Sequence, residues 1–231
     1  EQAIQAYRRA IEIQPNYAKA HNHLGITLLL KGDFRLGWQE YEWRLKCNNF
    51  PIEKRSFSQP VWDGSSLRGK TIFLYAEQGF GDTIQFIRYV YMLVQYKADI
   101  VFECQFELLT LFRNIEAITQ LIVEGDPLPD FDVHASLLSL SNIFCIDLES
   151  VPSKVPYLFP KLVSSICLSP NSKLKVGIAW TGNPKHSNDD TCSVDLQQFS
   201  ILFDIEACQF YSLQVRDRRN DIAKYKIILM L

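Results

Sequence analysis

The sequence predicts two kinds of structure in one chain, an all-α segment followed by an α/β region with parallel strands. Over the first 48 residues, apolar side chains recur at helical spacing, with breaks at Pro15 and at Lys-Gly-Asp (31–33). Beyond residue 70, apolar runs rich in strand-forming residues alternate with helical patterns. Strands of this kind, separated by helices, are typical of a parallel sheet that is buried on both faces.

The composition narrows the class of protein. The chain has 231 residues, of which 47% are hydrophobic and 22% charged, with a formal net charge of −2. We therefore expect a soluble globular protein with no nucleic-acid partner and no transmembrane segment. The six cysteines form no CxxC pair, which favours buried thiols, no metal site and a cytoplasmic location. Because residue 1 is Glu within an amphipathic pattern, we also expect a partial chain without a signal peptide.

The first 48 residues predict helix–turn–helix–turn–helix. A shift of 34 residues maps Ala3, Gln5 and Tyr7 onto Gly37, Gln39 and Tyr41. Gly25 and Gly37 would let paired helices approach closely, and the two tyrosines would fill the space between units. The segment resembles tetratricopeptide repeats, as the second helix of one unit followed by one complete unit. This resemblance implies a protein partner; the alternative is an ordinary amphipathic helical hairpin.

Residues 49–69 lack periodicity and predict an extended connector, with Trp62 as an aromatic anchor and a turn at Asp63-Gly64. The α/β elements follow in order. We expect strands at 70–76, 98–104, 119–125, from 174 onward and at 208–214, helices at 83–97 and 106–115, and a proline-rich loop at 126–140.

The first predicted strand ends in Glu-Gln-Gly-Phe-Gly-Asp, directly before a helix. Gly79 and Gly81 would let the backbone approach a bound group or adopt a positive φ. Asp82 has two interpretations: an N-cap of the following helix, or a general base that faces a cleft. The third glycine of the dinucleotide-binding fingerprint is replaced by Ile84, and no P-loop lysine follows.

Four blocks in order carry a second resemblance. These are "GKTIFLYAEQGFGDTIQFIRYV" (69–90), "LPDFDVHASLLSLSNIF" (128–144), "VPYL" (155–158) and "KVGIAWTGNPKHSND" (175–189). Together they resemble glycosyltransferase family 9, the ADP-heptose:lipopolysaccharide heptosyltransferases, in the bacterial form that follows tetratricopeptide repeats. The resemblance covers about residues 1–215. It implies a GT-B fold, in which two Rossmann-like domains enclose the nucleotide-sugar donor and the acceptor.

Carried onto this chain, the resemblance implies that Asp82 is the general base for a sugar or protein acceptor hydroxyl, with no metal or cofactor. Gly79 and Gly81 would shape its loop. The candidates for substrate binding are these two glycines, Gln78, His134, Thr181, Gly182, Asn183 and His186. Of these, Thr181, Gly182 and Asn183 would face the phosphates of the donor.

The implied domains are a repeat at 1–48, a linker at 49–69, an acceptor-side Rossmann-like domain at 70–168 and an incomplete donor-side domain at 169–231. Thr191 and Cys192 stand where the family has cations, and the later donor-binding stretch of the family is missing. We therefore expect the chain as given to be inactive in transfer. The alternative is a non-catalytic interaction scaffold with a degenerate GT-B region. The nucleocytoplasmic glycosyltransferases, which also join these repeats to a GT-B core, fit less well, because their histidine-containing pattern is not found.

Overall fold

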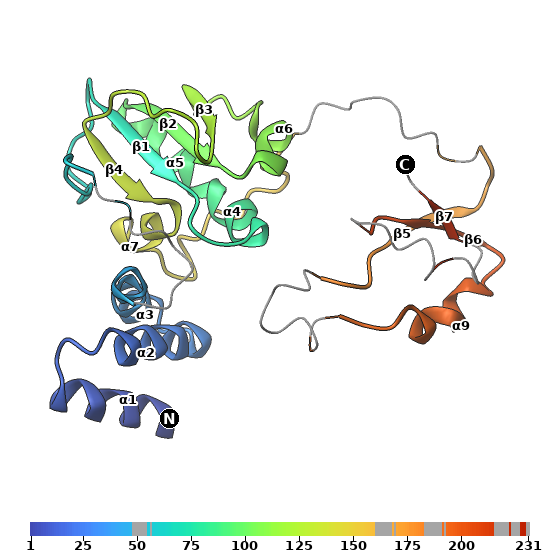
Figure 1. The fold of residues 1–231 in the computed structure, drawn as a ribbon, viewed down its shortest axis with the longest axis horizontal. Helices are drawn as coiled ribbons and strands as arrows, with labels where there is room; N and C mark the ends of the chain where they lie inside the picture. Colours follow the sequence, from blue (N-terminus) through green and yellow to red (C-terminus); the bar gives the residue numbers. More distant parts are fainter. Residues whose placement is uncertain are drawn as a thin grey trace. The chain divides into compact units, whose positions relative to one another are not determined.

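The computed structural model describes residues 1–47, 55, 57–159, 168, 170–182, 191, 193–214, 222 and 227–229. The chain divides into two compact units, Glu1–Leu162 and Val163–Leu231, and each is described by itself. In Figure 1 the first unit runs from the blue helices to the green and yellow sheet, and the second contains the orange and red elements.

Three helices open the first unit, as the periodicity predicts. They are α1 (Gln2–Ile13), α2 (Ala18–Lys31) and α3 (Phe34–Tyr41), and α3 continues into a 3₁₀ turn, η1 (Glu42–Lys46). α2 ends at Gly32, whose φ of 91° places it in the left-handed region that favours glycine. The Asp33 side chain then accepts a hydrogen bond from the Leu36 amide at 3.4 Å and caps α3.

Two glycines set the close packing of α2 and α3. A Cβ on Gly25 would lie 2.5 Å from the backbone nitrogen of Tyr41, and a Cβ on Gly37 would lie 2.8 Å from the Leu29 side chain. Both distances are too short for any real carbon contact. The predicted role of Gly25 and Gly37 in helix approach is therefore confirmed.

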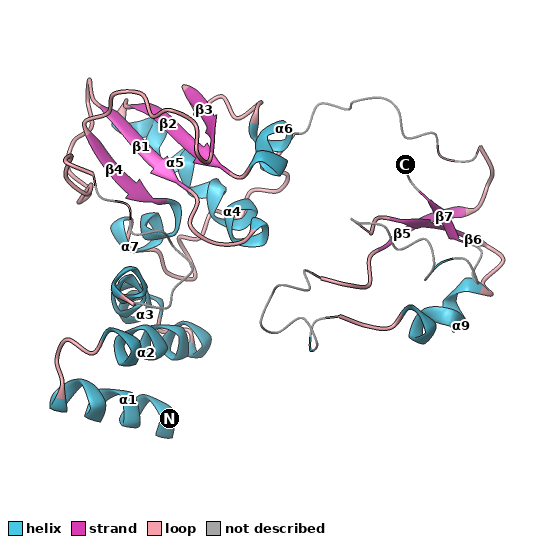
Figure 2. Ribbon diagram, in the orientation of Figure 1, coloured by secondary structure: helices cyan, strands magenta, loops and turns pink. Residues whose placement is uncertain are grey.

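A four-stranded parallel sheet follows in the order β3-β2-β1-β4 (Figure 2). Its strands are β1 (Thr71–Tyr75), β2 (Asp99–Cys104), β3 (Gln120–Val123) and β4 (Val133–Ser136). The prediction of an unbroken loop over 126–140 is wrong, because β4 lies inside it. This strand is fully buried but reads Val-His-Ala-Ser, so it carries no apolar run that a pattern search could detect.

The predicted helices of this region form short alternating pieces. The segment expected at 83–97 begins earlier and consists of α4 (Phe80–Phe86), η2 (Ile87–Tyr89), α5 (Val90–Leu93) and η3 (Val94–Tyr96). The segment expected at 106–115 consists of η4 (Phe106–Leu108) and α6 (Leu109–Phe112). After β4 come η5 (Leu137–Ser139) and α7 (Leu140–Ile143).

The two faces of the sheet bury different residues, since successive strand side chains point to opposite faces. Ile72 and Leu74 of β1 belong to the main core, which the helical segments share with Trp62 and Leu67. Phe73 and Tyr75 point the other way, into a smaller cluster with Val101, Ile122, Phe57 and Phe131. The connector and the loop before β4 therefore supply aromatic rings to the second face.

The second unit has its own parallel sheet, in the order β5-β6-β7. The strands are β5 (Leu174–Ile178), β6 (Cys208–Ser212) and β7 (Ile227–Leu229), with η6 (Leu196–Phe199) and α9 (Ser200–Phe203) between β5 and β6. The strands expected from 174 and at 208–214 are confirmed. Trp180, Leu196, Phe203, Phe210 and Ile222 form the core.

Across the described part of both units, none of the helices has the length and apolar character needed to cross a membrane.

Candidate functional site

The candidate site lies at the carboxyl ends of β1 and β4, which we call the β1–β4 edge. β1 lies between β2 and β4, so the chain places β2 and β3 on one side of β1 and then crosses to place β4 on the other side. In open parallel sheets, ligands bind outside the carboxyl ends of the strands at the point where the strand order reverses in this way. Glu77 and Gln78 follow β1 here, and Ser136 and Ser139 lie at and just beyond the end of β4.

The β1–β4 edge is occupied by Arg44, which η1 brings from the end of the helical segment. Its guanidinium donates to Glu77 Oε1 through Nη2 at 2.6 Å and Nε at 3.2 Å, and to the hydroxyls of Ser139 at 3.0 Å and Ser136 at 3.2 Å. Nη1 donates to Glu42 Oε1 at 2.7 Å. Burial favours a lower pKa of Arg44, but Glu77 and Glu42 outweigh it and raise that pKa. Arg44 thus stays charged and joins the helices to the sheet.

One oxygen at this edge has no partner. The Glu77 side chain is completely buried, and its Oε1 accepts hydrogen bonds from Arg44 and from the Ser136 hydroxyl. Its Oε2 contacts no donor within the described residues. A buried carboxylate oxygen without a donor costs free energy, so a water or ligand hydroxyl would be stabilised here.

The loop between β1 and α4 is held by Gln105, which follows β2. Gln105 Nε2 donates to the Gln78 carbonyl at 2.7 Å, and its Oε1 accepts from the Thr83 hydroxyl at 3.1 Å. Gln78 lies at the β1–β4 edge, as expected of a substrate-binding candidate. However, its side-chain amide already donates to the Tyr41 hydroxyl at 2.9 Å.

Asp82 lies in the first turn of α4, where the N-cap position belongs to Gly79 and no side chain caps the helix. The N-cap interpretation of Asp82 is therefore wrong, because the helix begins earlier than predicted. The carboxylate is half-buried and has no hydrogen bond or ion pair among the residues that the structure describes. Burial, and to a smaller extent the charges of Glu77 and Asp82, raise the pKa of the nearby Tyr41 phenol.

Neither Gly79 nor Gly81 adopts the positive φ that the sequence suggested, and Gly79 has a φ of −70°. A Cβ on Gly79 would lie 3.6 Å from Asp82 Oδ2, whereas a Cβ on Gly81 would meet no atom within 4 Å. Gly81 therefore leaves open space at its own position in the first turn of α4.

His134 does not join this group. It lies in β4 opposite Phe73 and points to the second face of the sheet, where its ring lies 4.7 Å from that of Phe57. Burial lowers its pKa, although a hydrogen bond with the Gln59 backbone opposes the shift. Its Nδ1 is buried and has no partner in the described part of the chain. α4 packs on the opposite face, through Phe86 in the main core.

The donor-side candidates belong to the second unit. The amide of Thr181 donates to Gln214 Oε1 at 3.0 Å, the Thr181 carbonyl accepts from Gln214 Nε2 at 2.9 Å, and the amide of Gly182 donates to the Ser193 hydroxyl at 2.9 Å. A diphosphate would have to replace these bonds. Asn183 and His186 lie outside the described residues. No His, Cys, Asp and Glu side chains within the described ranges form a group of three or more that could hold a metal ion.

α1 and α2 pack together at the start of the chain. Their contact is formed by Ile4, Leu24 and Leu28, and Tyr7 and Ile11 pack against it. Residues 1–32 match the TPR repeat family. The TPR match covers α1, α2 and the turn after them, and it suggests protein–protein interaction. No curated protein and no solved structure gives a significant match to the chain.

The sequence interpretation missed Arg44, Glu77, Gln105 and Ser136, which build the β1–β4 edge. Only Arg44 left a signal, as a cation between Trp43 and Leu45 in an aromatic stretch that follows the TPR match. In the same stretch, Trp38 packs edge-on against Phe86 of α4 at 5.8 Å.

Proposed function

We propose that the chain is a protein-interaction module in which TPR helices present a binding surface from an α/β support. The TPR match at residues 1–32 carries this proposal, because stacked helical repeats generally bind protein partners. The buried contact of Arg44 with Glu77 supports it further. A charged pair held at the sheet edge keeps the helices in one position, which lowers the ordering cost of binding.

Exposed apolar residues on α2 suit such a partner. Ile26 is 38% exposed and Leu30 is 83% exposed. Because they are four residues apart, they lie on the same side of the helix. Large apolar side chains paired on one helix face favour a partner that buries them.

The test is site-directed photo-crosslinking in cells that express the protein. A benzoylphenylalanine at position 30 should trap one discrete partner, whereas the same residue at position 148, where Leu148 is 75% exposed, should not. Binding is then measured with the purified partner. Replacing both Ile26 and Leu30 by Glu should weaken binding more than tenfold, and Leu148→Glu should not. Equal trapping at both positions, or unchanged binding of the double variant, contradicts the proposal.

Sugar transfer is a second candidate function, and two observations favour it. The all-parallel order β3-β2-β1-β4 is the order of the first four strands of the doubly wound nucleotide-binding fold, 3-2-1-4-5-6. Asp82 lies in the first turn of α4, shortly after β1, and a Cβ on the neighbouring Gly81 would meet no atom within 4 Å. We infer a GT-B-like acceptor domain, with the second unit as the start of a donor domain that includes Thr181, Gly182, Asn183 and His186.

In this mechanism the Asp82 carboxylate takes the proton of an acceptor hydroxyl. The freed oxygen forms a bond to the anomeric carbon of the nucleotide sugar, and the bond to the diphosphate breaks. The acceptor is a sugar or a protein, and a protein acceptor could be the partner of the TPR helices.

Because the chain as given is expected to be inactive in transfer, both tests use the full-length parent protein. Calorimetry with a panel of nucleotide sugars tests donor binding, and mass spectrometry of candidate acceptors tests transfer. Asp82→Asn should abolish transfer but leave donor binding intact, while the exposed Asp130→Asn should change neither. Full transfer by Asp82→Asn would remove this residue from the mechanism.

We place both functions in the cytoplasm. The described cysteines Cys47, Cys104, Cys145 and Cys208 are free thiols, which is the usual state in a reducing compartment.

A further inference from the structure

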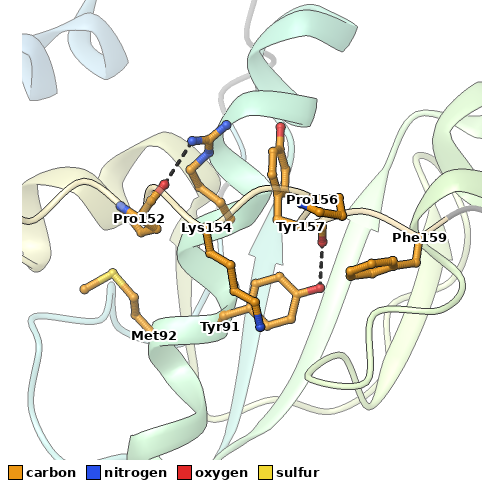
Figure 3. Close-up of a pocket in the computed structure, with 8 residues that line it drawn as sticks. Tyr91, Met92, Pro152, Lys154, Pro156, Tyr157 and Phe159 are labelled. Carbon is orange, nitrogen blue, oxygen red and sulfur yellow. Dashed lines mark hydrogen bonds between the residues drawn. The ribbon is translucent and has the colours of Figure 1, made fainter.

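A hollow of about 310 Å³ lies on the first unit, apart from the β1–β4 edge. One wall comes from the end of η2 and from α5, and the other from the extended segment at 152–159 (Figure 3). Its volume is at the lower end of the range for small-molecule sites. None of the residues assigned above to catalysis, substrate binding or the β1–β4 edge lines it.

The extended wall is fixed by side-chain hydrogen bonds along its length. Arg88 Nη1 donates to the Pro152 carbonyl at 3.0 Å, and the Tyr91 hydroxyl donates to the Tyr157 carbonyl at 3.0 Å (Figure 3). The Tyr157 hydroxyl in turn donates to the Ile84 carbonyl at 2.9 Å. The wall is therefore in place before anything binds, which lowers the cost of binding.

The lining combines an apolar surface with positive charge. Its apolar and aromatic members are Tyr91, Met92, Pro152, Pro156, Tyr157 and Phe159. The charged members are Arg88 and Lys154, and among the residues that the structure describes no acidic side chain lines the hollow. Burial raises the pKa of the Tyr91 hydroxyl, and the negative charge of the nearby Glu116 raises it further.

The two cations are used differently. Arg88 lies over the Tyr157 ring at 4.3 Å and donates through Nε to the Gln85 carbonyl at 2.8 Å. Its guanidinium therefore already has partners within the protein. Lys154 is exposed, and its ammonium has no ion pair or hydrogen bond among the described residues. In Figure 3 its side chain extends alongside Tyr91. Lys154 is thus available to an anion that enters the hollow.

We propose that this hollow binds a small aromatic anion, a flat ring system with one carboxylate or sulfonate. The ring lies against Tyr91, Pro156 and Phe159, and the acid pairs with Lys154. Aromatic and proline surfaces favour a flat apolar body, and a cation at the rim of a site without acids selects a negative group. A sugar is disfavoured, because the lining offers few unused hydrogen-bonding groups.

The experiment is a fluorescence titration of the whole chain with two dyes. One is 8-anilinonaphthalene-1-sulfonate, and the other is N-phenyl-1-naphthylamine, which has the same rings without the charge. The sulfonate should bind at one saturable site and more weakly as salt is raised. Lys154→Gln should weaken the sulfonate about two- to fivefold, as expected for one exposed ion pair, and leave the neutral dye unchanged. Phe159→Ala should weaken both dyes.

The matched control is Lys70→Gln, which removes an exposed lysine elsewhere on the same unit and should affect neither dye. Near-ultraviolet circular dichroism verifies that each variant stays folded. The proposal is overturned if the sulfonate shows no saturable binding, or if Lys70→Gln and Lys154→Gln have the same effect. It is also overturned if Lys154→Gln weakens the neutral dye equally.

Discussion

Arg44 and Glu77 are 33 residues apart in the sequence, yet their side chains form an ion pair at 2.6 Å in which both are completely buried. One residue ends the helical segment and the other follows the first strand. Because taking charges out of water is costly, such a pair survives only with further hydrogen bonds. Glu42, Ser136 and Ser139 supply them.

Removing one member of the Arg44–Glu77 pair should lower the free energy of unfolding far more than removing both members. Glu77→Leu leaves the Arg44 charge buried without its main partner, and should lower the free energy of unfolding by about 3–5 kcal/mol. The double variant Arg44→Met, Glu77→Leu should recover much of this loss. Urea unfolding followed by circular dichroism measures each variant. Additive losses would show that the two side chains act independently.

Gly25→Ala should destabilise the helical segment by about 1–3 kcal/mol, because the new methyl group would lie 2.5 Å from the Tyr41 backbone nitrogen. Gly81→Ala is the matched control in another helix, where the methyl group meets no atom within 4 Å. Alanine is a better helix former than glycine, so this variant should be neutral or slightly stabilising. Thermal unfolding compares them, and equal effects would contradict the close approach of α2 and α3.

His134 should make stability depend on pH. Burial lowers its pKa from the ordinary value of 6.5, so the unfolded chain binds a proton more readily than the folded one. The free energy of unfolding should therefore fall as pH drops below about 6.5, by at most about 1.4 kcal/mol per pH unit, until the folded-state pKa is reached. His134→Phe should lose this component, which is measured as the difference between the urea-unfolding free energies of variant and parent from pH 7.5 to 5. A constant difference across that range would contradict the assignment.

The thiols should react unequally. Burial, and then the charge of Glu103, raise the pKa of Cys104 to about 12, and the thiolate is the reactive form. Cys145 is exposed. With N-ethylmaleimide at pH 7.5, peptide mapping should find Cys145 modified within minutes and Cys104 modified only after unfolding. Rapid labelling of Cys104 in the native protein would show that β2 opens readily.

Much of the fold could be predicted from local patterns. β1 and β2 are apolar runs, and Gly32 and Asp33 are a helix stop and a helix start. β4 could not be predicted, because its burial comes from β1 beside it and from the ring of Phe57 packed on His134. For the glycines of the β1–α4 loop, residue type predicted either a close approach to a bound group or a positive φ, and the structure shows no positive φ at either of them.

The candidate site was less predictable than the fold. Asp82 and Gln78 belong to a short motif that a sequence displays directly. Arg44 and Gln105 reach the same edge from distant positions, 33 residues before Glu77 and 27 residues after Gln78. Such pairs depend on how the chain folds back on itself, so no local pattern indicates them.

The side chains that the connector contributes to both faces of the sheet have a practical consequence for dissecting the protein. Trp62 and Leu67, in the main core, are 2% and 0% exposed, and Phe57 packs against Phe73 and Tyr75 on the second face. A truncation that begins at residue 70, where the strands start, would remove these side chains and expose the apolar surface beneath them to water, which favours aggregation. A fragment meant to contain the sheet should retain Arg55, whose guanidinium pairs with the buried Glu103, and also Arg44, which pairs with the buried Glu77.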